Sequence, residues 1–183
     1  MIRKAVEGLL GALVLLALAW GGQWLYYRWT EPPPEAELFR VLDVVDGDEI
    51  IVGYHGQRTL VRYIGINAPE VDHPTRGREP GGQEAAAVNR ELVGGKWISL
   101  ELTDEVRDRF GRVLAYVWIP QADGRELMAN AEMVARGYAR VATFHANEQY
   151  AAQFRDLEGQ ARTTGRGLWS GDSPAGWSRR SYR

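Results

Sequence analysis

Short segments rich in β-branched residues, separated by turn dipeptides, most constrain how this chain can fold. The turn dipeptides are Asp46-Gly47 and His55-Gly56. Apolar segments of this length with such turns between them predict antiparallel strands joined as a meander. The first three predicted strands are residues 38–45, 49–54 and 58–64, and two more follow at 97–102 and 113–119.

Helical patterns are interposed among these strands and follow them. An alanine-rich stretch closes on Gly94-Gly95, and two later stretches place apolar residues at helical spacing. The three predicted helices are residues 84–92, 126–136 and 147–163. Five short strands with interposed helices predict an α+β fold, a small five-stranded β-barrel of the OB type packed with about three helices.

The net charge and the absence of cysteine limit the kinds of binding and catalytic site that such a domain could contain. The 183 residues include 22 Lys and Arg against 24 Asp and Glu, which gives a formal net charge of −2. This charge argues against a protein that binds nucleic acid through an overall basic surface, so any contact with phosphate must be local. The absence of cysteine excludes disulfides, thiolate nucleophiles, cysteine-ligated zinc and iron–sulfur clusters.

Residues 8–27 form an apolar stretch whose only strongly polar member is Gln23. At the rise of an α-helix the stretch reaches about 30 Å, the thickness of a bilayer core. Arg3 and Lys4 precede it, so the positive-inside rule predicts an N-terminus in the cytoplasm. The sequence thus predicts a single N-terminal transmembrane helix, with the rest of the chain outside the cytoplasm, periplasmic or extracellular.

An alternative interpretation takes the same region as a signal peptide that is cleaved after Ala19. Both interpretations export the folded part of the chain, and the aromatic residues that continue past Ala19 favour the anchor. The predicted organisation is an anchor or signal segment at 1–30, a proline-rich linker at 31–36, the folded domain at 37–170 and a basic tail at 171–183.

Polar motifs lie where the predicted strands would bring them to one end of the barrel. Asp46-Gly47-Asp48 occupies the first turn, Arg62 lies in the third strand and Asn67-Ala68-Pro69-Glu70 follows it. Asp108-Arg109-Phe110-Gly111-Arg112 introduces the last strand, and Gly167-Leu168-Trp169-Ser170 ends the domain. In this order and spacing, the motifs resemble the staphylococcal nuclease (thermonuclease) family over about residues 38–170.

The residue types fit the hydrolysis of a phosphodiester. Guanidinium groups match phosphate oxygens bidentately, so Arg62 and Arg112 suit the clamping of charge that builds up in the transition state. Glu70 suits the general base that activates water. The resemblance implies the same roles and also implies a calcium ion held by the side chains of Asp48 and Asn67 and by the carbonyl of Ala68.

Two positions depart from the family pattern. Members usually carry Asp where this chain has Asn67, so we expect calcium affinity to be weakened but not abolished. Glu49 stands where the family often has Thr or Ser. Alternation along a regular strand predicts that its side chain points away from that of Asp48, so Glu49 is not counted as a replacement ligand.

The sequence therefore predicts an exported, membrane-anchored, calcium-dependent nuclease that acts as a monomer on DNA or RNA with low sequence specificity. Phosphate recognition would explain low base specificity. The alternative is a noncatalytic nucleic-acid-binding module whose metal site has eroded, beginning at Asn67.

Overall fold

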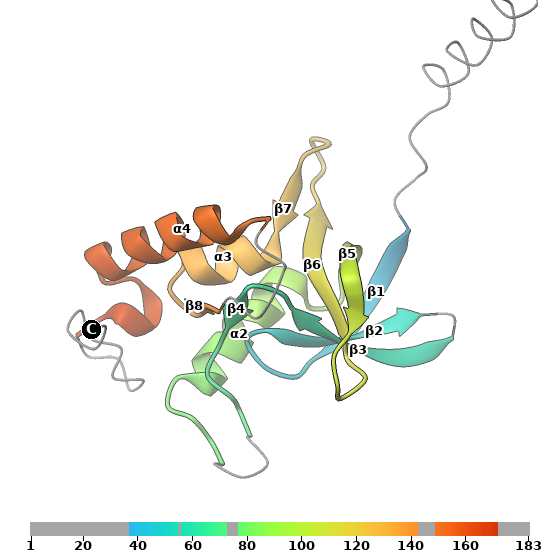
Figure 1. Ribbon diagram of the computed structural model, residues 1–183, viewed down its shortest axis with the longest axis horizontal. Coiled ribbons are helices and arrows are strands. Elements are labelled where there is room, and N and C mark those ends of the chain that lie inside the picture. Colours follow the sequence, from blue (N-terminus) through green and yellow to red (C-terminus); the bar gives the residue numbers. More distant parts are fainter. Residues whose placement is uncertain (1–36, 55, 73–76, 143–148, 172–183) are drawn as a thin grey trace, which may run out of the picture. The chain divides into compact units, whose positions relative to one another are not determined.

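The computed structural model describes residues 37–54, 56–72, 77–142 and 149–171. Five strands form a closed barrel, which confirms the predicted OB-type α+β fold (Figure 1). The sheet runs in the order β3-β2-β1-β5-β6, and β6 returns to pair with β3 in parallel. The barrel strands are β1 (Leu38–Val44), β2 (Glu49–Tyr54), β3 (Gln57–Tyr63), β5 (Trp97–Arg107) and β6 (Val113–Pro120).

The first three strands form the predicted antiparallel meander. Glu49 of β2 pairs with Arg62 of β3, and Tyr54 pairs with Gln57 at the other end of the hairpin. The register of β1 against β2 shifts between Val41 and Asp43, a bulge that bends this strand. The fourth predicted strand, 97–102, is longer in the structure because β5 continues to Arg107 before the chain turns into β6.

The prediction of a helix over residues 126–136 is wrong in its first turn. Residues Glu126–Met128 form strand β7, which pairs antiparallel with the end of β6, and helix α3 covers Ala129–Ala135. The apolar side chains of Leu127 and Met128 suit the buried face of a helix and that of a strand equally well. Pairing with the end of β6 selects the strand, and no local sequence pattern reports that pairing.

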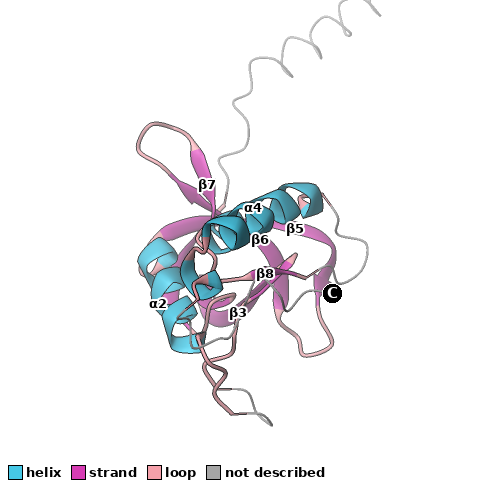
Figure 2. Cartoon of the chain, turned by 90° about the vertical axis from the view of Figure 1, so that its left-hand side faces the viewer, coloured by secondary structure: helices cyan, strands magenta, loops and turns pink. Residues whose placement is uncertain are grey.

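The helices gather at one end of the barrel, on the left in Figure 1 and toward the viewer in Figure 2. Helix α2 covers Gly82–Val93, and helix α4 covers Ala151–Thr164, which starts later than predicted. Strands β4 (Ile66–Asn67) and β8 (Arg140–Val141) pair as a small second sheet, and a short 3₁₀ helix covers Gly167–Trp169.

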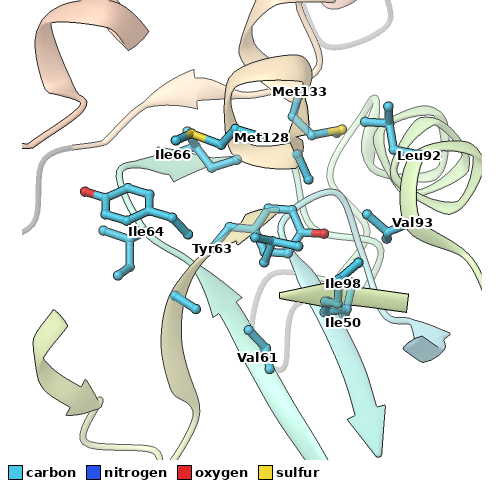
Figure 3. Close-up of a cluster of buried hydrophobic side chains, with 14 of the residues drawn as sticks. Ile50, Val61, Tyr63, Ile64, Ile66, Leu92, Val93, Ile98, Met128 and Met133 are labelled. Carbon is cyan, nitrogen blue, oxygen red and sulfur yellow. The ribbon is translucent and has the colours of Figure 1, made fainter. Parts of the chain in front are cut away.

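A continuous apolar core joins the barrel to the helices (Figure 3). Side chains from the barrel strands alternate inward, and α2 and α3 add apolar groups that close the core. The residues labelled in Figure 3 are Ile50, Val61, Tyr63, Ile64, Ile66, Leu92, Val93, Ile98, Met128 and Met133. This packing fixes the strand ends and the loops that carry the polar motifs.

The predicted anchor at 8–27, the linker at 31–36 and nearly all of the tail at 171–183 lie outside the described residues. Among the helices that the structure does describe, none has the length and apolar character needed to cross a bilayer. The predicted N-terminal organisation therefore stays a prediction.

Candidate active site

The loop between β1 and β2 carries Asp46 and Asp48, and tight packing fixes its path. A Cβ atom on Gly47 would lie 2.8 Å from the Cβ of Ala85 and closer still to the Cβ of Ala68, so only glycine fits there. The backbone N–H of Asp48 donates to Oδ1 of Asp46 at 3.0 Å, which closes the turn. Both carboxylates are nearly inaccessible to solvent, so each must be balanced by partners within the protein.

Arg62 lies at the end of β3 and connects this loop to the segment that follows the strand. Its guanidinium forms an ion pair with Asp48 and donates to Oδ1 of Asn67 at 2.9 Å. A longer hydrogen bond of 3.4 Å reaches the carbonyl oxygen of Ile66. Burial lowers the pKa of Arg62 to about 10, so the group remains cationic at neutral pH.

The three groups predicted to hold calcium are adjacent. Oδ2 of Asp48 accepts the backbone N–H of Ala68 at 2.6 Å, and Nδ2 of Asn67 donates to the carbonyl oxygen of Ala68 at 3.3 Å. Carboxylate, amide and carbonyl oxygens are the hard ligands that calcium prefers, so this set fits the ion in its chemistry. Within the described residues, no group of three or more His, Cys, Asp or Glu side chains is arranged to hold a metal, and this mixed set is the candidate.

Glu70 follows this segment, and its backbone is held by Glu79, which precedes α2. The N–H of Glu70 donates to Oε2 of Glu79 at 3.2 Å, and the N–H of Glu79 donates to the carbonyl of Glu70 at 3.0 Å. Gly82 lies so close to this carbonyl that a larger residue would displace it. The backbone of Glu70 is therefore fixed while its side chain is half-buried.

The electrostatic surroundings of Glu70 favour its protonated form. Partial burial and the neighbouring charge and hydrogen bond of Asp46 raise the pKa of Glu70 to about 7, with a smaller contribution from Glu49 and an opposing one from Arg62. Burial likewise raises the pKa of Asp46. A carboxyl group that titrates near neutrality can take and return a proton at physiological pH, as a general base must.

Arg112 reaches the same place from the start of β6. Asp108 holds it twice, because Nε of Arg112 donates to Oδ2 of Asp108 at 2.7 Å and the backbone N–H of Arg112 donates to Oδ1 at 3.0 Å. Nη1 of Arg112 also forms an ion pair with Oε1 of Glu49. Burial alone would lower the pKa of Arg112, but the hydrogen bond with Asp108 and the charge of Glu49 raise it.

The predicted residues are thus brought together at one end of the barrel, and three further residues take part that the sequence analysis assigned no role. We call the following residues the charged cluster: Asp46, Asp48, Glu49, Arg62, Glu70, Asp108 and Arg112. Asp46 and Asp108 both belong to motifs described in the sequence analysis. Their short spacing to Asp48 and Arg112 is the one sequence signal that could have predicted these contacts.

The sequence indicated no contact between Glu49 and the other predicted site residues. In the structure, Nε of Arg62 lies 4.0 Å from Oε1 of Glu49 while the same guanidinium pairs with Asp48. Glu49 is the first residue of β2, and the expectation that it is not a replacement calcium ligand stays a prediction. Burial and the charge of Asp46 raise the pKa of Glu49, and Arg112 opposes that shift.

This arrangement suits chemistry at an anionic group. Two guanidiniums that approach a common point can hold phosphate oxygens and offset charge that develops during reaction. A half-buried carboxylate beside them, with a pKa of about 7, can accept a proton from water. Oxygen ligands for a divalent cation lie next to both, through the shared contacts of Arg62.

Comparison with known proteins agrees with this chemistry. Residues 60–171 match the family model described as staphylococcal nuclease homologue. A thermonuclease of Staphylococcus hyicus is 32% identical over 134 residues, which cover 73% of this chain and 76% of the relative. Endonuclease YncB of Bacillus subtilis is 36% identical over 69% of this chain and 58% of its own length.

A second Bacillus subtilis relative, the SPbeta prophage-derived endonuclease YokF, is 37% identical over 69% of this chain but only 42% of its own length. This chain therefore spans about half the length of these two Bacillus relatives. Together, the relatives confirm the predicted class of enzyme, a thermonuclease-like hydrolase. The chain belongs to the staphylococcal nuclease homologue family.

Proposed function

We propose that this protein is a calcium-dependent nuclease that hydrolyses phosphodiester bonds of DNA or RNA with low sequence specificity. The observation that carries the proposal is the convergence of Arg62 and Arg112 beside Glu70. Two guanidiniums and a carboxyl group with a raised pKa form the combination that phosphodiester hydrolysis requires. The names of the relatives, thermonuclease and endonuclease, support the same substrate class.

In the proposed reaction, Arg62 and Arg112 bind oxygens of the scissile phosphate. The Glu70 carboxylate accepts a proton from water as the water oxygen attacks phosphorus, and the bond from phosphorus to the leaving oxygen breaks. The leaving oxygen then takes a proton from solvent water, and Glu70 releases to solvent the proton that it accepted. Asp48, Asn67 and the carbonyl of Ala68 would hold calcium, which when bound supplies Lewis-acid neutralisation of the phosphate charge.

Low sequence specificity follows from what the charged cluster offers. Its groups suit the phosphate, which is the same at every nucleotide, and contacts to phosphate carry no direct sequence information. We therefore expect preference between DNA and RNA to depend on groups outside this cluster.

The test is digestion of plasmid DNA, single-stranded DNA and RNA by the full chain, each with calcium, with magnesium and with chelator. Digestion that needs calcium is the expected result. Binding of nucleic acid without cleavage under all three conditions would contradict the proposal and would support the noncatalytic binding module instead.

We propose further that residues 8–27 anchor the protein in a membrane, with the nuclease domain outside the cytoplasm and monomeric. The apolar length of this segment and the preceding Arg3 and Lys4 support that orientation. An intact N-terminus, identified by mass spectrometry in the membrane fraction, is the expected result. A mature chain that starts at Trp20 would instead indicate a cleaved signal peptide.

A further inference from the structure

Glu49 lies directly across the hairpin from Arg62. The two residues pair in the register of β2 and β3, and cross-strand partners place their side chains on the same face of a sheet. Glu49 is only 8% exposed, and a buried carboxylate needs charged or hydrogen-bonding partners. The role of this side chain therefore depends on its partners within the charged cluster.

Both arginines of the candidate site approach one oxygen of this carboxylate. Nη1 of Arg112 pairs with Oε1 of Glu49, and Nε of Arg62 lies 4.0 Å from the same oxygen. Guanidinium groups bind carboxylate and phosphate through the same planar donor geometry. A phosphate oxygen that binds between the two arginines must therefore displace Oε1 of Glu49 from that position.

Neither arginine depends on Glu49 for its position. Arg112 is held by Asp108 through a side-chain hydrogen bond of 2.7 Å and a backbone hydrogen bond of 3.0 Å. Arg62 is held by its ion pair with Asp48 and by Asn67 at 2.9 Å. A carboxylate that only positioned these side chains would add little to the contacts that they already have.

We propose that Glu49 is an internal competitor for the substrate phosphate, a carboxylate that occupies a donor of Arg112 and lies beside Arg62 until nucleic acid displaces it. The inference rests on the proposed function, because it identifies Glu49 as the group that the scissile phosphate replaces beside the two arginines. Glu49 is thereby a determinant of substrate affinity, and it lowers affinity for anionic ligands.

The test is the binding of a fluorescent single-stranded oligothymidylate to the full chain in chelator, measured by anisotropy, so that neither metal nor cleavage enters the readout. Glu49→Gln keeps the shape of the side chain and removes its charge. We expect it to bind the oligonucleotide about tenfold more tightly at low salt, and the gain to shrink as salt screens the charges. Glu49→Ala should change binding in the same direction.

Two controls separate charge competition from other effects. An oligothymidylate with neutral methylphosphonate linkages should bind wild type and Glu49→Gln equally. Asp123→Asn, which removes the carboxylate of an exposed ion pair with Arg125 away from the charged cluster, should leave binding of the anionic oligonucleotide unchanged.

The outcomes distinguish this inference from the proposed function. Unchanged or weaker binding by both Glu49 variants, in a protein whose wild type digests nucleic acid, overturns the competitor and leaves the nuclease intact. An equal gain for the neutral oligonucleotide also overturns it, because charge would not be the cause. A wild type that digests no nucleic acid under any condition removes the nuclease and the competitor together.

Discussion

Two regions of this molecule bury polar side chains, and they do so in different ways. At the helical side, Asn130 is fully buried, and within the described residues its side chain bonds to neutral backbone groups. Its Oδ1 accepts the N–H of Val117 at 2.9 Å, and its Nδ2 donates to the carbonyls of Ile64 at 2.9 Å and Ala115 at 3.4 Å. In the charged cluster, carboxylates and guanidiniums are instead balanced by one another.

The difference teaches which buried polar groups serve the fold and which serve the site. These partners of Asn130 are backbone groups, so the side chain works as an internal brace between β6 and the segment after β3. In the charged cluster, Glu49 and Glu70 have raised pKa values even though arginines lie beside them. Carboxyl groups whose pKa values are raised in this way are typical of functional sites, where burial and neighbouring charges adjust the pKa for proton transfer.

The largest expected effect is on turnover. Glu70→Ser removes the proposed base, and Arg112→Ala removes a guanidinium that would stabilise the charge of the transition state. We expect each to lower kcat by about 10²- to 10⁴-fold while the thermal unfolding midpoint stays close to that of wild type. Steady-state digestion kinetics and thermal unfolding of the same preparations measure both quantities.

The matched control for these variants is Asp123→Asn, in which another carboxylate that pairs with an arginine is removed from an exposed position. Its kcat should equal that of wild type, since exposed ion pairs contribute little. Wild-type kcat in either Glu70→Ser or Arg112→Ala would remove that residue from the mechanism.

The next largest effect is on stability and concerns the other region. Asn130→Ala removes the hydrogen bonds that the side-chain amide makes with the buried N–H of Val117 and the carbonyl of Ile64, so we expect it to lower the free energy of unfolding by about 3 kcal/mol. Urea denaturation measures the loss. Activity per folded molecule should be retained, and a fall in kcat comparable to that of Glu70→Ser would break the division between the two regions.

A smaller effect tests the electrostatics of the charged cluster itself. In the metal-free protein the Glu70 carboxyl should titrate near pH 7, protonated below this value and ionised above it. Asp46→Asn removes the nearest like charge, so the pKa of Glu70 should fall. It should stay above the ordinary value, because burial is the larger cause of the shift.

Titration of the side-chain carboxyl carbons by NMR, with Glu70→Gln to assign the resonance, provides the measurement. A Glu70 that already titrates at its ordinary value in the wild type would show that burial and Asp46 do not act on it as described. A pKa unaltered by Asp46→Asn would attribute the whole shift to burial.

How far the sequence predicts the structure depends on the range of the interactions. The five barrel strands follow from short β-branched segments and turn dipeptides, which act locally, so their positions were predicted closely, apart from the end of β5, which continues five residues past the predicted end to Arg107. Residues 126–128 were assigned to a helix because β7 forms only through pairing with β6, a contact that lies outside the local pattern.

The candidate site shows the same limit. The motifs predicted that Asp48, Arg62, Glu70 and Arg112 would converge, since each lies at a turn or strand end on one side of the barrel. The contacts of Glu49 with both arginines were missed because they depend on its cross-strand pairing with Arg62 and on where the turn before β6 places Arg112. These partners are distant in the sequence, and local patterns do not report such contacts.

The smallest expected effect concerns Asn67, where the amide oxygen already accepts a hydrogen bond from Arg62 at 2.9 Å. Asn67→Asp adds a negative charge to the proposed calcium ligands, and calcium affinity rises with the charge of its ligands, so we expect about tenfold tighter binding. The added carboxylate also attracts Arg62, which opposes the ion and keeps the gain modest. Calorimetric titration with calcium measures the difference. Equal calcium affinities of wild type and Asn67→Asp would mean that Arg62 offsets the new charge in full. The proposed ligands would then serve to bind Arg62 and not calcium.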